Sequence, residues 1–138
     1  MNRTPIQLAA TIVGVVFLAA GVAGFIPGIT TNAGDMALYG HKSPAMLLGI
    51  FQVSVLHNII HLVFGVAGLV MAKAAAKMYL VGGGAIYLVT WLYGVAIGPA
   101  TSLNFVPLND ADNWLHLGLG AGMAAVGLAL GKTPAHKA

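Results

Sequence analysis

Four long apolar segments, separated by short polar ones, constrain the fold of this 138-residue sequence more than any other feature. Only 7% of the residues are charged, whereas a soluble domain carries about a quarter, so the composition is not that of a soluble protein. A helix that crosses a bilayer needs roughly 20 mainly apolar residues. The sequence therefore predicts one all-α membrane domain, an up-down-up-down bundle of four transmembrane helices at about residues 5–26, 45–72, 78–98 and 112–131.

The basic residues indicate how these helices are oriented. In the four-span arrangement, five of the six lysines and arginines fall on one side of the membrane, namely Arg3, Lys73, Lys77, Lys132 and Lys137, and only Lys42 falls on the other. Short cytoplasmic loops carry the excess of positive charge in membrane proteins. We therefore expect both termini in the cytoplasm. The first segment is long and has only Arg3 before it, so we expect a retained span rather than a signal peptide.

A nine-residue motif occurs twice, at residues 57–65 and 112–120, with a constant offset of 55 positions. Both copies read His or Asp, then Asn-x-x-His-Leu-x-x-Gly. Because the second and fourth spans run in the same direction, the pattern predicts a parallel internal repeat of two helical hairpins. The first and third spans support it weakly, since residues 21–23 before Pro27 resemble residues 94–96 before Pro99.

The polar residues of the motif predict a metal site between the second and fourth spans. His57 and His61 are four residues apart, as are Asp112 and His116, so each pair lies on one face of its helix. Polar faces turn toward the interior of a membrane bundle. Three imidazoles and one carboxylate around a common centre are a suitable set for zinc, iron or copper.

Haem is an alternative ligand for the same helices. In that hypothesis His61 and His116 bind the iron from opposite sides. Gly65 and Gly120, one turn further along each helix, would leave space for the porphyrin. The haem hypothesis accounts better for the glycines, and the ion hypothesis accounts better for His57 and Asp112.

A third interpretation is purely structural. In the metal hypothesis, Asn58 and Asn113 are expected to hydrogen-bond the imidazoles and orient them around the ion. The same Asp-His-Asn network, however, would also serve to fix helix packing in a structural or assembly subunit. In that case Asp112 is no more than a helix cap.

The start of the second span raises a geometric question. The apolar segment begins some 13 residues before His57, whereas Asp112 lies near the start of its span. Either the second helix extends beyond the membrane, or the segment before Asp112 dips into the bundle. Both arrangements put the polar cluster in the outer half of the membrane.

Composition also limits the partners and the chemistry. The absence of cysteine excludes disulfides and thiolate ligands, and no G-x-S-x-G motif is present. A net charge of +3 is too small to indicate nucleic acid. The expected partners are the lipid bilayer and either another membrane protein or a second copy of the chain.

With these residues in view, the chain resembles a family of small four-span bacterial membrane proteins known as a domain of unknown function. The resemblance rests on residues 49–65 and 111–120, which contain the His-Asn-x-x-His and Asp-Asn-x-x-His motifs. It implies four spans and a location in the bacterial inner membrane. It implies no activity.

Overall fold

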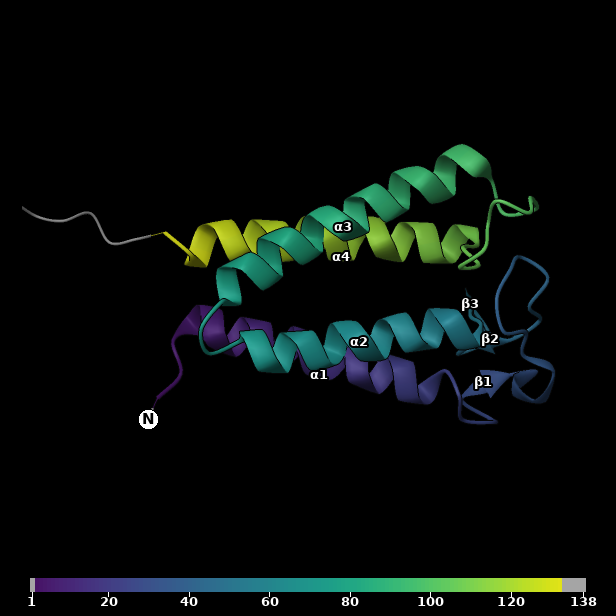
Figure 1. Ribbon diagram of the computed structural model, residues 1–138, viewed down its shortest axis with the longest axis horizontal. Helices are drawn as coiled ribbons and strands as arrows, with labels where there is room; N and C mark the ends of the chain where they lie inside the picture. Colours follow the sequence, from purple (N-terminus) through teal and green to yellow (C-terminus); the bar gives the residue numbers. More distant parts are fainter. Residues whose placement is uncertain (1, 133–138) are drawn as a thin grey trace, which may run out of the picture.

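Four α-helices and a small β-sheet make up the protein in this computed structural model, which describes residues 2–132 (Figure 1). Successive helices run in opposite directions, as Figure 1 shows. The all-α, four-helix architecture predicted from the sequence is confirmed. The helices are α1 (Pro5–Ala23), α2 (Val55–Met71), α3 (Ala76–Ile97) and α4 (Asp110–Leu130).

The two ends of the bundle differ. Residues 24–54 and 98–109 form the two long connections, and we call their end of the bundle the loop end (right in Figure 1). At the opposite end, which we call the turn end, α2 joins α3 through the short turn of residues 72–75. Arg3, Lys73, Lys77 and Lys132 lie at the turn end, and Lys42 lies at the loop end. Lys137 lies outside the described residues.

The helices associate as two hairpins. α1 packs along the length of α2, and α3 packs along α4, while contacts between the two hairpins are fewer. Glycines bring the backbones together within each hairpin. A Cβ atom on Gly14 would lie 2.9 Å from the Gly65 carbonyl oxygen, and one on Gly84 would lie 2.7 Å from the Gly120 carbonyl oxygen. Such close approach at small residues is typical of helix packing in membranes.

Helix α2 begins later than the sequence predicted. The apolar residues before Val55 instead form strands β2 (Met46–Leu47) and β3 (Phe51–Gln52), which pair with β1 (Thr30–Thr31) in an antiparallel sheet of order β1-β2-β3. A short 3-10 helix, η1 (Ala33–Asp35), lies between β1 and β2.

The cause of the late start is a turn between β2 and β3. Leu48 and Gly49 have positive φ angles of 55° and 68°, which an α-helix cannot accommodate. Helix α2 starts only after Ser54, whose hydroxyl oxygen accepts the backbone N–H of His57 at 3.1 Å. A short apolar segment does not by its hydrophobicity distinguish a buried strand from a helix.

Three of the helices, α1, α3 and α4, are long and apolar enough to cross a membrane. α2 is apolar but has 17 residues, at the short end of the range for a span. Large apolar side chains cover the outside of the bundle; for example, Val63, Val70 and Val89 are 60–72% exposed. These surfaces fit a protein surrounded by lipid.

Candidate metal centre

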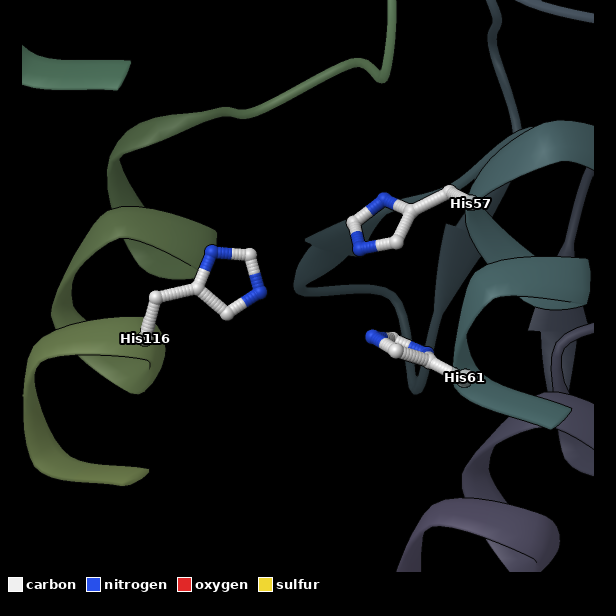
Figure 2. A group of neighbouring side chains, drawn as sticks. All are labelled: His57, His61 and His116. Carbon is white, nitrogen blue, oxygen red and sulfur yellow. The ribbon is translucent and has the colours of Figure 1, made fainter. Parts of the chain in front are cut away.

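Three histidines meet between the two hairpins, toward the loop end. His57 and His61 come from α2 and His116 comes from α4, and one ring nitrogen of each lies within 4.8 Å of the others. Figure 2 shows each ring turning a nitrogen toward the space that the three share. All three side chains are buried, with exposures of 1–6%. The structure thus brings together three of the four residues that the sequence indicated as ligands.

The histidines face one another because α2 and α4 start at matching positions. Ser54 caps α2 and Asn109 caps α4, and these caps are separated by the same 55 positions as the two motif copies. A cap fixes the residue at which the first turn begins. His61 and His116 therefore lie equally far into their helices. The different helix starts expected from the sequence do not occur.

A backbone carbonyl orients the ring of His57. The Nδ1 atom of His57 lies 3.1 Å from the carbonyl oxygen of Pro107, in the connection between α3 and α4. A carbonyl only accepts, so Nδ1 carries the proton and Nε2 keeps its lone pair. Histidines that bind metals typically donate their other nitrogen in this way.

Asn104 organises the loop that carries Pro107. Its amide nitrogen donates to the carbonyl oxygens of Pro99 and Leu108, both at 3.1 Å, and its oxygen accepts the Leu108 N–H at 2.7 Å. The side chain is fully buried. The sequence does not single out Asn104, because no motif surrounds it. The only signal is an amide between the apolar residues Leu103 and Phe105.

The two long connections are also joined to each other. The N–H of Gly40 donates to the carbonyl oxygen of Phe105 at 2.7 Å, and the side-chain amide of Asn109 donates to the carbonyl oxygen of Ile50 at 2.9 Å. Pro107, which faces His57, is buried among them. These contacts cover the histidine site at the loop end of the bundle.

Aromatic side chains line the opposite side of the site. The ring of Phe17 on α1 lies 5.9 Å from that of His61, and the ring of Tyr87 on α3 lies 5.1 Å from that of His116. Phe17 and Tyr87 stack on each other at 5.2 Å. The sequence did not single out Tyr87, whose hydroxyl is buried without a hydrogen-bond partner. The histidines therefore sit in a largely apolar environment.

A cavity of about 200 Å³ adjoins the three histidines. Its wall consists of side chains from α2, α3, α4 and the covering loop: His57, Ile60, His61, Phe64, Ile86, Tyr87, Thr90, Val106 and His116. The only polar groups in this wall besides the imidazoles belong to Tyr87 and Thr90, and the Thr90 hydroxyl already donates to the Ile86 carbonyl oxygen at 2.9 Å. A ligand in this cavity would meet the imidazoles from a mainly apolar space.

Asp112 lies outside the group of three ligand atoms. Its carboxylate oxygen accepts the backbone N–H of Asn109 at 3.0 Å, and its own N–H donates to the Asn109 side chain at 2.9 Å. This reciprocal pair is a capping box at the start of α4. The arrangement agrees with the structural role considered for Asp112 and does not place it as a fourth ligand.

The two motif asparagines do not contact the imidazoles through hydrogen bonds. The amide of Asn58 packs against Gly24 and donates to the sulfur of Met36 at 3.5 Å, and the amide of Asn113 packs against Gly94. Neither glycine has room for a Cβ atom. In this structure each asparagine instead fills the space left by a glycine on its hairpin partner, and their expected role beside a bound metal stays a prediction.

The motif glycines also allow close packing of the two helices within each hairpin. Gly65 faces Gly14 and Leu18 on α1, and Gly120 faces Gly84 and Leu88 on α3. They do not open a slot between His61 and His116. The reason for expecting a porphyrin at these glycines is therefore removed, because their missing side chains make room for a neighbouring helix.

Comparison with known proteins gives a family. A family model described as a domain of unknown function (DUF4383) matches residues 7–129. The chain belongs to this family. The match spans nearly all of the four helices and both motif copies, and it confirms the resemblance to a family of unknown function. No curated protein and no solved structure matches the chain.

Proposed function

We propose that the protein is an integral membrane protein that binds one transition-metal ion through His57, His61 and His116. The observation that carries this proposal is the convergence of three buried imidazole nitrogens, from two different helices, to within 4.8 Å of one another. Buried polar groups cost free energy when they lack a partner. A metal ion gives the three imidazole nitrogens a common partner and links the two hairpins.

The geometry suits a tetrahedral ion after a small adjustment. Zinc–nitrogen bonds of 2.0–2.1 Å place tetrahedral ligand atoms roughly 3.3 Å apart. The three nitrogens, within 4.8 Å of one another, would close by at most about 1.5 Å, which side-chain rotation can supply. Three protein ligands leave a fourth position open, and imidazole also suits copper and iron. Among these metals we favour zinc, because zinc sites with three protein ligands and one open position are common.

His57 favours an ion over haem. The ring centroid of His57 lies 4.5 Å from that of His61 and 5.8 Å from that of His116. A porphyrin held between His61 and His116 would extend outward in all directions from its iron, and His57 occupies part of that region. With Gly65 and Gly120 facing neighbouring helices, haem binding would require the hairpins to separate.

The other polar residues of the motif have structural roles. Asp112 completes a helix cap, and Asn58 and Asn113 fill the space beside glycines. The histidine side chains neither cap a helix nor face a glycine, and each turns one ring nitrogen toward the space that the three share. This difference supports a ligand at the histidines rather than a network that only fixes packing.

We further infer that the protein lies in the bacterial inner membrane with its turn end toward the cytoplasm. The supporting observation is that Arg3, Lys73, Lys77 and Lys132 all lie at the turn end. A reporter fused to the C-terminus and assayed for cytoplasmic activity tests this orientation. Activity only on the outer side would contradict it.

We also infer that the two hairpins are copies of one unit. Equivalent contacts occur at fixed separations: Gly14 and Gly84 each face a motif glycine, and Gly24 and Gly94 each face a motif asparagine, both 70 positions apart. Gly94 therefore corresponds to Gly24, and not to Gly21 as the sequence comparison suggested. Loops of different length explain why this separation differs from 55.

Metal analysis of the purified protein tests the proposed site. We expect about one zinc ion per chain after incubation with zinc and removal of the excess, measured by elemental analysis. His61→Ala and His116→Ala should each lose the bound ion. Asp112→Asn should keep it, because that carboxylate lies outside the group of three.

Three results would contradict the proposal. A Soret absorption band that disappears in His61→Ala would indicate haem instead. Retention of zinc in both histidine variants would place the ion elsewhere. Absence of zinc, copper and iron from the wild-type protein under all loading conditions would leave the structural interpretation.

A further inference from the structure

A second cavity continues from the histidine site along the groove between α2 and α3. It has a volume of about 330 Å³ and shares two wall residues, Phe64 and Ile86, with the cavity at the histidines. Its wall is apolar and consists of Val63, Phe64, Ala67, Met71, Met78, Tyr79, Gly82, Gly83 and Ile86. We call the two cavities together the α2–α3 crevice.

The crevice opens toward the lipid phase. Val63, Met78 and Ile86, which line it, are 60%, 68% and 53% exposed on the outer surface of the bundle. At the loop end, the hydrogen-bonded connections around Pro107 cover the histidines. A ligand would therefore reach the three imidazoles sideways from the membrane and not from the aqueous side.

Charge indicates the chemistry of the ligand's polar end. Three imidazoles are neutral donors, so a divalent ion bound to them alone would carry its full charge in an apolar site. Uncompensated charge in such a site is costly. Among the described residues the group of candidate ligands contains no carboxylate, and Asp112 serves the helix cap. An anionic oxygen from outside the chain would neutralise the ion and fill its fourth position.

Size indicates the rest of the ligand. From His57 to Met71, helix α2 rises about 21 Å at 1.5 Å per residue. The hydrocarbon part of one leaflet is about 15 Å thick. The crevice is thus long enough for one acyl chain. The 200 Å³ cavity at the histidines is small, which suits a carboxylate better than a bulky phospholipid headgroup.

We propose that the α2–α3 crevice binds a free fatty acid, with its carboxylate at the metal and its chain along Phe64, Gly82 and Gly83. This inference rests on the proposed metal site. The apolar crevice receives the chain, and the ion at its loop end receives the negative charge. The protein would accordingly act on, carry or sense a single-chain carboxylate lipid taken from the surrounding leaflet.

Gly82 offers a direct way to block the crevice. It lines the second cavity, and a Cβ atom added there meets nothing within 4 Å, so the backbone tolerates a side chain and we expect Gly82→Leu to obstruct the crevice. Gly122 on α4 also has open space at its Cβ position and is also exposed, which makes Gly122→Leu a matched control. Ile86→Trp, at the junction of the two cavities, is a second obstruction.

The test uses the full chain in detergent micelles, loaded with Co²⁺ as a spectroscopic substitute for zinc. Oleate is titrated while the visible absorption of the bound cobalt is recorded, and methyl oleate, which lacks the carboxylate, is titrated in parallel. We expect oleate and not methyl oleate to shift the cobalt spectrum. The apparent affinity for oleate should fall at least tenfold in Gly82→Leu and Ile86→Trp and stay unchanged in Gly122→Leu. Cobalt affinity should be the same in Gly82→Leu, Gly122→Leu and the wild type.

The outcomes separate the two proposals. Cobalt binding without a response to oleate, or an equal response in Gly82→Leu and wild type, would overturn the fatty acid and leave the metal site. A response to methyl oleate as strong as that to oleate would also overturn it, because the carboxylate would then have no role. Failure of the wild-type protein to bind cobalt, zinc or copper would overturn both proposals.

Discussion

Replacing Asn104 by alanine should loosen the loop that covers the histidines. The side chain is fully buried and makes three hydrogen bonds of 2.7–3.1 Å to the loop backbone. Each such bond contributes about 1 kcal/mol, and the N–H and carbonyl groups of buried Leu108 would be left without this partner. We therefore expect the free energy of unfolding to fall by about 3 kcal/mol, which corresponds to a melting temperature lower by roughly 10 °C.

The same substitution should weaken metal binding without removing a ligand. Pro107, whose carbonyl oxygen holds Nδ1 of His57 at 3.1 Å, lies three residues after Asn104 in this loop. Loss of such an orienting partner typically lowers metal affinity by about 10- to 100-fold. Thermal unfolding followed by circular dichroism and zinc titration, both in detergent, measure the two effects.

Ser102→Ala is the control for this prediction, because Ser102 is exposed in the same loop. A substitution of this kind usually changes stability by less than about 0.5 kcal/mol. If Asn104→Ala unfolds and binds zinc as Ser102→Ala does, the loop does not depend on Asn104. The loop around Pro107 would then have no part in holding the proposed metal site.

Four further predictions follow from the helix contacts and the site. Gly84→Ala should destabilise the protein by about 1–3 kcal/mol relative to Gly82→Ala. A Cβ atom at position 84 would lie 2.7 Å from the facing backbone of α4, whereas position 82 has open space. Equal melting temperatures of the two variants would contradict this prediction. Ser54→Ala should cost about 1 kcal/mol through loss of the α2 cap, measured by denaturant unfolding, and a fully stable variant would argue against the cap. Zinc at 100 times its dissociation constant should raise the free energy of unfolding by about 2.7 kcal/mol in the wild type but not in His116→Ala, and stabilisation of both would place the ion elsewhere. Acidification should release zinc, because protons compete for the imidazole nitrogens; pH-independent occupancy in equilibrium dialysis would exclude imidazole ligands.

The helical part of the fold could be predicted because its cause is local. Each helix is an apolar segment of suitable length that ends at glycine, proline or polar residues, and these features are visible in the sequence. The meeting of His61 and His116 was also predictable, since both lie at the same place in a repeated motif. The 55-residue offset shared by Ser54 and Asn109 would have located the start of α2 as well.

The errors come from contacts that the sequence does not display. Residues 46–52 are as apolar as a helix, and only the positive φ angles of Leu48 and Gly49 turn them into strands. The roles of Asn58 and Asn113 depend on Gly24, which follows the end of α1, and on Gly94 of α3, and neither glycine is next to its asparagine in the sequence. A stripe of polar and small residues on a helix therefore indicates a buried face, but it does not say which neighbour each residue meets.

His57 and Asp112 occupy the same backbone position, the third residue of their helices, and this equivalence has a consequence for how the site arose. An acid at this position can accept the N–H of its own cap, and Asp112 does so. A neutral imidazole protonated at Nδ1 has no such obligation, and His57 turns instead toward the carbonyl of Pro107 and the other histidines. In the α3–α4 hairpin the side chain at this position caps its own helix, whereas in the α1–α2 hairpin it is available to bind a ligand. In the proposed repeat, this difference between the two halves, rather than their likeness, gives the proposed metal centre its third imidazole.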